Sequence, residues 1–183
     1  ADGPFDVVLV AVKAFDTEGL GRELAGAPGL GVVASFQNGV GNEAVLMAAL
    51  AGRRIPSPRE RPLAFATDVL AGTLTQPAWI VAPGVVAAGA KGGAGVAMAA
   101  RADLASAGGA LVAALVAGGV PARAYTDGAA MKWSKLALNL VGAATSALLG
   151  RPPREVIVEQ RWFGVERAIL REALAVMRAL DLS

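Results

Sequence analysis

The sequence predicts an α/β domain that is followed by an all-helical segment, with the boundary near Tyr125. The first observation is a β-α-β unit, in which strand patterns at residues 7–12 and 31–36 flank a helical pattern at residues 17–25. The second is that the chain after Tyr125 shows helical spacing of apolar side chains and no strand pattern. The predicted units are residues 1–124 and residues 125–183.

The first unit begins with a continuous β-branched run at residues 7–12, which is typical of a central parallel strand buried on both faces. A Pro-Gly pair ends the following helix before the second strand. The next helix is predicted at residues 42–50, where Asn42 is the expected N-cap and Glu43 complements the helix dipole in the first turn.

The middle of the chain leaves this alternation of strands and helices. Residues 53–61 are rich in Arg and Pro, which predicts an exposed loop. Strand patterns follow at residues 65–75, 78–82 and 85–88, and a Pro-Gly turn separates the last two. This stretch therefore indicates antiparallel hairpins.

Helices dominate the rest of the chain. An Ala-rich helix is predicted at residues 103–117 and a short extended segment at residues 120–125. Asp127 is the expected N-cap of a long helix to about Leu149, where a Gly-Arg-Pro-Pro sequence stops it. The last helix, at residues 161–180, is amphipathic, and its apolar side predicts a contact between two copies of the chain.

Composition excludes several classes of function. The 183 residues are 55% apolar and 17% charged, which suits a globular protein, and the small net charge of +2 argues against nucleic acid as a partner. The chain has no Cys and no His, so disulfides, thiol nucleophiles, imidazole bases and most transition-metal sites are excluded. Proton transfer is left to Lys, Asp, Glu or Tyr.

A membrane span is the weaker interpretation of the nineteen uncharged residues at 104–122. Ala and Gly make up most of this run, Ser106 and Pro121 interrupt it, and small residues contribute little transfer free energy, so a buried helix is favoured. Residues 1–4 show no secretory signal. We expect a cytoplasmic protein that does not enter the membrane.

Two glycine-rich stretches invite comparison with nucleotide-binding motifs. Gly39, Gly41 and Ala44 have the spacing of the dinucleotide fingerprint, but no strand with a terminal acidic residue follows about twenty positions on. We expect these glycines to permit a tight turn at a helix start, where N–H groups can face an anion. Residues 89–95 lack the P-loop ending and predict a mobile hairpin tip.

Polar residues at two places have spacing that suits catalysis or binding. Lys135 and Asn139 lie one turn apart on a mostly apolar helix, where an ammonium group gives up its proton more readily and an amide can orient a substrate oxygen. Lys13 and Asn38 follow two parallel strands, at the sheet edge where ligands of such sheets bind. The alternatives are a solvated lysine at the edge of a buried helix and ordinary polar loop residues.

Four segments, taken in order, resemble the ketopantoate reductase family from about Asp6 to the end of the chain. They are DVVLVAVKA at 6–14, QNGVGNE at 37–43, KWSKLALN at 132–139 and SAL at 146–148. The resemblance implies the second half of a Rossmann-like dinucleotide-binding domain, followed by a helical domain, with the active site in the cleft between them. The family's glycine-rich fingerprint and C-terminal end have no counterpart here, so we expect further sequence at both ends.

The resemblance also implies an activity, namely reduction of 2-dehydropantoate to pantoate by NADPH in pantothenate and coenzyme A biosynthesis. Lys135 would be the catalytic lysine, and Asn139 and Asn38 would bind the substrate. Lys13, Asn38 and, by an alignment through the Pro-Gly turn, the backbone near Ala71 would contact the cofactor. No metal site is implied, and the expected partners are a small 2-oxo acid and a second copy of the chain, bound through the C-terminal helices.

Two departures from the family pattern leave alternatives open. Ala143 stands where the family has a second Asn one turn after the one matching Asn139, and a further substrate-binding Asn falls near Pro153. A related NAD(P)-dependent 2-oxo acid or opine-type dehydrogenase and a non-catalytic dimerising relative are the other hypotheses. The choice between NADPH and NADH also stays open.

Overall fold

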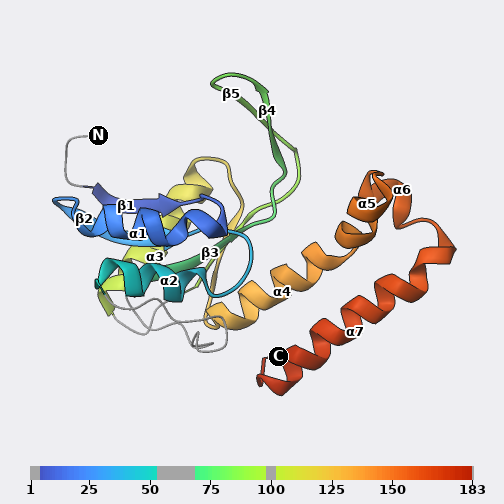
Figure 1. Cartoon of the computed structure of the whole chain (residues 1–183). Coiled ribbons are helices and arrows are strands. Elements are labelled where there is room, and N and C mark those ends of the chain that lie inside the picture. Colours follow the sequence, from blue (N-terminus) through green and yellow to red (C-terminus); the bar gives the residue numbers. More distant parts are fainter. Residues whose placement is uncertain (1–4, 53–68, 98–101, 183) are drawn as a thin grey trace.

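The computed structural model describes residues 5–52, 69–97 and 102–182 (Figure 1). The predicted loop at 53–61 lies outside the described residues, as does the beginning of the strand predicted at 65–75. The remaining strands and helices can be compared with the structure one by one.

One mixed sheet of five strands forms the centre of the molecule, in the order β1-β2-β3-β6-β7. Strands β1, β2 and β3 are parallel, β6 runs antiparallel to β3, and β7 runs parallel to β6. Their bounds are Phe5–Val10 for β1, Leu30–Ser35 for β2, Val69–Leu74 for β3, Ala94–Ala97 for β6 and Ala122–Tyr125 for β7.

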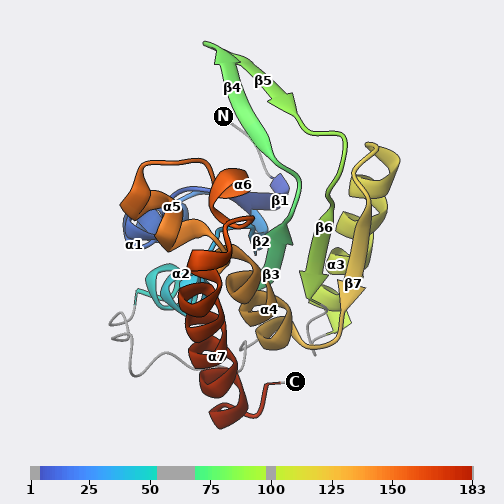
Figure 2. The same ribbon diagram turned by 90° about the vertical axis from the view of Figure 1, so that its right-hand side faces the viewer.

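Helices cover both faces of this sheet (Figures 1 and 2). Because side chains alternate along a strand, neighbouring residues of β2 enter two different cores. Val33 packs with Leu46 in the cluster that involves α1 (Thr17–Ala25) and α2 (Asn42–Leu50). Ala34 belongs to the cluster beneath α3 (Ala102–Ala117). The bounds of α1 and α2 match the sequence prediction.

The prediction that β1 is a central strand is wrong for the described part of the chain. Within residues 5–52, 69–97 and 102–182, β1 pairs with β2 alone and forms an edge of the sheet. Leu9 is accordingly 53% exposed. The apolar run was a correct sign of a parallel strand, but composition does not fix a strand's position in the sheet.

A separate hairpin of β4 (Ala78–Ala82) and β5 (Val85–Ala88) projects from the body (Figures 1 and 2). Its tip is the Pro-Gly turn, in which Gly84 has a φ of 76°. The prediction that residues 89–95 form a mobile hairpin tip is therefore wrong. These glycines lead from the hairpin into buried β6, and the N–H of Gly93 donates to the Thr75 hydroxyl at 3.0 Å.

The helical part follows β7, and the division into units at Tyr125 stays a prediction. Its helices are α4 (Gly128–Leu140), α5 (Ala143–Leu149), α6 (Pro153–Val156) and α7 (Phe163–Ala179). Asp127 caps α4 as expected, since its side chain accepts the N–H of Ala130 at 2.9 Å. Helix α7 returns alongside α4 (Figure 2).

The single helix predicted from Asp127 to Leu149 is in fact two helices. Val141 is extended and Gly142 has a φ of 74°, which separates α4 from α5. A Cβ at Gly142 would lie 2.8 Å from Cγ2 of Ile157, and Glu166 of α7 accepts the N–H of Gly142 at 2.7 Å. The break thus depends on distant residues. No helix in the described part of the chain is long and apolar enough to span a bilayer.

Candidate active site at the carboxyl edge of the sheet

Gln37 joins the two loops that leave the carboxyl ends of β1 and β2. Its side chain is 3% exposed and donates from Nε2 to the Val12 carbonyl at 3.0 Å and to Thr17 Oγ1 at 2.7 Å. The hydroxyl of Ser35 donates to Gln37 Oε1 at 3.3 Å. A buried amide that is satisfied on both sides fixes the geometry of its surroundings. Gln37 therefore holds both loops at one edge of the sheet.

Lys13 and Asn38 are exposed polar residues of these two loops. Lys13 precedes the short 3₁₀ helix η1 (Ala14–Asp16) after β1, and Asn38 directly follows Gln37 after β2. Both residues lie at the carboxyl edge of the sheet, as the sequence predicts. Ligands of open α/β sheets bind at this edge.

The turn after Asn38 has the tight geometry expected from its glycines. Gly39 and Gly41 have φ angles of 89° and 83°, and Gly41 is the N-cap of α2. The prediction of Asn42 as the N-cap is therefore wrong. A left-handed cap position favours glycine, so Asn42 becomes the first helical residue, and its Nδ2 donates to the Asn38 carbonyl at 2.9 Å.

A buried ion pair that sequence reasoning missed attaches α4 to the sheet. Nζ of Lys132 lies 2.9 Å from Oε1 of Glu43, and the two side chains are 2% and 1% exposed. The same ammonium donates to the carbonyls of Gln37 at 2.7 Å and Gly72 at 3.1 Å. One side chain thus connects α4 with α2 and with the ends of β2 and β3. The signal in the sequence was a glutamate in an otherwise apolar helix.

This attachment positions the two α4 residues selected from the sequence. Lys135 and Asn139 follow Lys132 at i+3 and i+7, on the same side of the helix. Nδ2 of Asn139 lies 3.5 Å from Oδ1 of Asn38, a long contact between side chains 101 positions apart. The structure therefore brings together Asn38 and Asn139, which the sequence placed in different motifs.

Lys135 is half-buried in a cavity of about 330 Å³ between α4 and the sheet. Thr73 and Tyr125 line it from the strands, and Met131 and Leu138 line it from the helix. A cation held in such a site can stabilise a negative charge that develops on a bound molecule. No group of three acidic side chains that could hold a metal ion occurs in the described ranges.

Comparison with known proteins identifies the family. The family model described as ketopantoate reductase PanE/ApbA matches residues 1–97, more than half of the chain. The chain belongs to this family. A search of curated proteins found no match.

Solved structures of ketopantoate reductases share the fold of the chain. The PanE/ApbA family ketopantoate reductase from Ralstonia eutropha JMP134 is 26% identical, with a TM-score of 0.73 over 97% of this chain and 53% of that one. The 2-dehydropantoate 2-reductase from Geobacter metallireducens GS-15 is 25% identical, with a TM-score of 0.74 over 94% and 53%. A D-mandelate dehydrogenase solved with NADH shares the fold at 16% identity, with a TM-score of 0.77 over 97% and 55%.

The chain therefore spans about half the length of the family structures that it matches. Its fold is the expected one, part of a Rossmann-like domain followed by a helical region. The remaining residue predicted at the site, Ala71, lies within β3. Ala71 is 2% exposed and packs with Ala97 and Met131, so its side chain faces the core, and the role of the backbone near it stays a prediction.

The two positions that depart from the family pattern lie beyond the end of α4. Ala143 is the first residue of α5, so the break at Gly142 separates it from the helical face of Asn139. Pro153 is the first residue of α6 and lies close to Gly142. The positions that depart from the pattern are therefore on a different structural element from Lys135 and Asn139.

Proposed function

We propose that this protein reduces 2-dehydropantoate (ketopantoate) to pantoate with NADPH, a step of pantothenate and coenzyme A biosynthesis. Membership of the ketopantoate reductase family supports the reaction class. The observation that carries the proposal is the contact of Asn139 with Asn38, one helical turn along α4 from Lys135, which joins α4 to the carboxyl edge of the sheet.

The exposed residues at this edge fit a nicotinamide cofactor. Lys13 offers a cation and Asn38 an amide, and both are accessible. A Cβ at Gly39 would meet only Nδ2 of Asn42, at 3.9 Å, so a ligand can approach the backbone closely there. Lys13, Asn38 and the backbone near Ala71 would hold the cofactor, which supplies a hydride to the keto carbon when bound.

Lys135 and Asn139 would act on the substrate. The ammonium group of Lys135 donates a hydrogen bond to the keto oxygen, stabilises the negative charge that grows there, and gives up a proton to form the alcohol. Asn139 and Asn38 bind hydroxyl or carboxylate oxygens of the substrate and so align its carbonyl. Leu138 and Met131 line the cavity next to Lys135 and can contact the apolar part of the substrate.

A second candidate is the reduction of another 2-oxo acid with NADH or NADPH. Ala143 supports it, because an alanine cannot form the hydrogen bonds of the family's asparagine. A neighbour of the same fold is a D-mandelate dehydrogenase with NADH. The reaction and the role of Lys135 would be the same, and only the contacts to the rest of the substrate would differ.

The experiment is a measurement of cofactor oxidation by the longest available form of the protein, with each of NADPH and NADH. Ketopantoate and simpler 2-oxo acids are offered separately. Turnover of ketopantoate in clear preference to the others, with NADPH, is the expected result. Turnover of a different 2-oxo acid would favour the second candidate, and no oxidation with any of them would contradict both.

We also propose that the protein forms a homodimer through its C-terminal helices. Four large apolar side chains of α7 are at least one-third exposed, namely Phe163, Val165, Leu174 and Val176. Burial of such surface against a second copy contributes roughly 25 cal/mol per Å². Sedimentation equilibrium of the longest form is expected to give twice the chain mass, and Val176→Arg to give a monomer. A monomeric wild-type protein would contradict this.

A further inference from the structure

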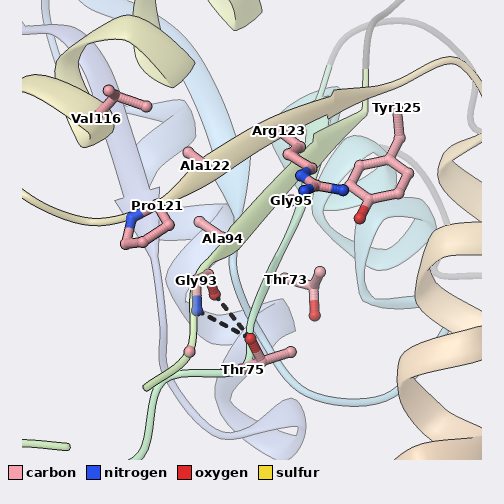
Figure 3. A pocket seen from close by; sticks show the side chains of 11 residues that line it. Thr73, Thr75, Gly93, Ala94, Gly95, Val116, Pro121, Ala122, Arg123 and Tyr125 are labelled. Atoms are coloured by element: carbon pink, nitrogen blue, oxygen red, sulfur yellow. Dashed lines mark hydrogen bonds between the residues drawn. The ribbon is translucent and has the colours of Figure 1, made fainter. Parts of the chain in front are cut away.

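A second cavity of about 430 Å³ opens beside the one that holds Lys135 (Figure 3). The two cavities share Thr73, Thr75 and Tyr125, so they are neighbouring compartments of one depression on the sheet. The second compartment extends from these residues to Arg123 of β7. None of the sequence motifs discussed above includes Arg123.

The strand register aligns three residues that line this depression. Thr73 of β3 pairs with Gly95 of β6, and Gly95 pairs with Arg123 of β7, which places the three residues in one row across the sheet. A Cβ at Gly95 would lie 2.8 Å from both Sδ of Met131 and Cε2 of Tyr125. Met131 and Tyr125 therefore pack closely against this glycine, and Thr73 and Arg123 flank it along the row. We call the polar lining formed by Thr73, Arg123 and Tyr125 the trough.

The opposite face of the same strands contributes to the core beneath α3. Ala94, Val96 and Ala122 alternate with the trough residues and pack with Leu111 of α3. Side-chain alternation thus assigns the apolar residues to the core and the polar ones to the trough. Figure 3 shows the side chains of Arg123 and Tyr125 next to each other on β7.

The charges around the two compartments favour a ligand with two negative groups. The charged side chains that line them are Lys135, Arg123 and Asp127. Asp127 is engaged as the cap of α4, where its carboxylate accepts the N–H of Ala130. Arg123 forms no ion pair with any residue in the described ranges. One compartment therefore offers the cation proposed for catalysis and the other a guanidinium, which can bind a carboxylate with two parallel hydrogen bonds.

We infer that Arg123 binds a distal carboxylate of the substrate, so that the protein also accepts 2-oxo dicarboxylic acids. This inference rests on the proposed function, since it takes Lys135 as the group that binds the keto oxygen. Thr73 and the phenol of Tyr125 line the path between the two cations and can hydrogen-bond to the chain of the substrate. The trough makes Arg123 a determinant of specificity, with no part in the hydride or proton transfer.

The test compares pairs of 2-oxo acids with equal carbon number and with or without a distal carboxylate. The pairs are oxaloacetate with 2-oxobutyrate, 2-oxoglutarate with 2-oxopentanoate, and 2-oxoadipate with 2-oxohexanoate. For at least one pair, kcat/KM is expected to be higher for the dicarboxylate.

Arg123→Gln is expected to lower that preference by about tenfold or more and to leave kcat/KM for the monocarboxylate unchanged. Arg123→Lys is expected to keep part of the preference. Arg22→Gln, a surface arginine of α1 paired with Glu18, is the matched control.

Calorimetric titration of the same dicarboxylates into the wild-type and Arg123→Gln proteins gives a readout that does not need turnover. Binding that weakens about tenfold in the variant supports the site even if no 2-oxo acid is reduced, in which case only the proposed function fails. Turnover of ketopantoate without any preference for a dicarboxylate, or a preference unchanged by Arg123→Gln, would overturn the inference and leave the proposed function in place.

Discussion

Two clusters of charged and polar side chains in this molecule differ in burial and therefore in what they do. The buried polar cluster consists of Gln37, Glu43 and Lys132, each at most 3% exposed. The exposed charged cluster consists of Arg151, Glu159 and Arg161, in which Arg151 Nη1 and Arg161 Nε lie 2.5 and 2.6 Å from the two Glu159 oxygens. Short distances occur in both, but solvent screens only the second.

The comparison teaches that the energetic importance of an ion pair cannot be judged from its length. Removing one partner of the buried pair leaves a charge without compensation in the interior, whereas the partners in the exposed cluster are solvated by water. Gln37 of the buried cluster directly precedes Asn38, and Lys132 lies on the helix of Lys135 and Asn139. We conclude that the buried cluster positions the candidate active site, while the exposed cluster connects side chains of residues 151–161 at the surface.

The largest effect is expected from breaking the buried pair. Lys132→Met removes the ammonium from Glu43 and from two carbonyls, and we expect a loss of about 3–5 kcal/mol in the free energy of unfolding. The double variant Lys132→Met with Glu43→Leu is expected to lose clearly less than the sum of the two single losses, because no unpaired charge remains. Urea denaturation measures all three variants, and additive losses would refute the coupling.

A smaller loss is expected from Gln37→Leu, which removes the hydrogen bonds between the loops after β1 and β2. The carbonyl of Val12 and the hydroxyl of Thr17 lose their amide partner, at a cost of about 1–3 kcal/mol. Since the same amide positions Lys13 and Asn38, KM for the cofactor should rise as well. A variant of unchanged stability and unchanged KM would show that the loops are fixed by other contacts.

The C-terminal helices are expected to depend on a backbone turn more than on the exposed cluster. Gly142→Ala forces a positive φ on alanine and brings its Cβ to 2.8 Å from Ile157, so we expect a loss of about 1–2 kcal/mol. Gly109→Ala is the matched control, because this glycine lies within α3 with nothing within 4 Å of the added Cβ. It is expected to stabilise the protein by about 0.5–1 kcal/mol. Thermal denaturation that ranks the two variants in the opposite order would contradict the account.

The smallest effect is expected from Glu159→Gln, and it should depend on pH. The hydrogen bond from Arg151, then the one from Arg161, lowers the pKa of Glu159 below its ordinary value. A carboxyl group whose pKa is lowered by folding contributes stability above its unfolded pKa, about 4.3, and loses this contribution as the pH falls through the folded value. The variant should thus be slightly less stable than the wild type near pH 7 and equal to it in strong acid. A difference that grows on acidification would be inconsistent with the lowered pKa.

Local patterns predicted much of the fold and part of the site. The bounds of α1 and α2, the hairpin turn and the cap at Asp127 depend on residues close in sequence, and these predictions are confirmed. The break between α4 and α5 was not predicted, because a continuous helix satisfies the local pattern, whereas the turn at Gly142 lies against Ile157 and Glu166, which are distant in sequence.

The same distinction applies to the site. Lys13, Asn38, Lys135 and Asn139 could be selected from the sequence because each lies in a recognisable position on a strand end or a helix face. The pairing of Lys132 with Glu43 and the row from Thr73 to Arg123 could not be selected, since both depend on how distant elements pack and on strand register.

The most direct test of the central claim is the steady-state rate of NADPH oxidation with ketopantoate for the wild type and for Lys135→Ala. The account predicts that kcat falls by about 10²–10⁴-fold while the denaturation midpoint stays the same, because Lys135 donates the proton and is not part of the buried cluster. Lys91→Ala, a change at an exposed lysine between β5 and β6, should leave the rate unchanged. An unchanged kcat in Lys135→Ala would contradict the assignment of this lysine as the proton donor.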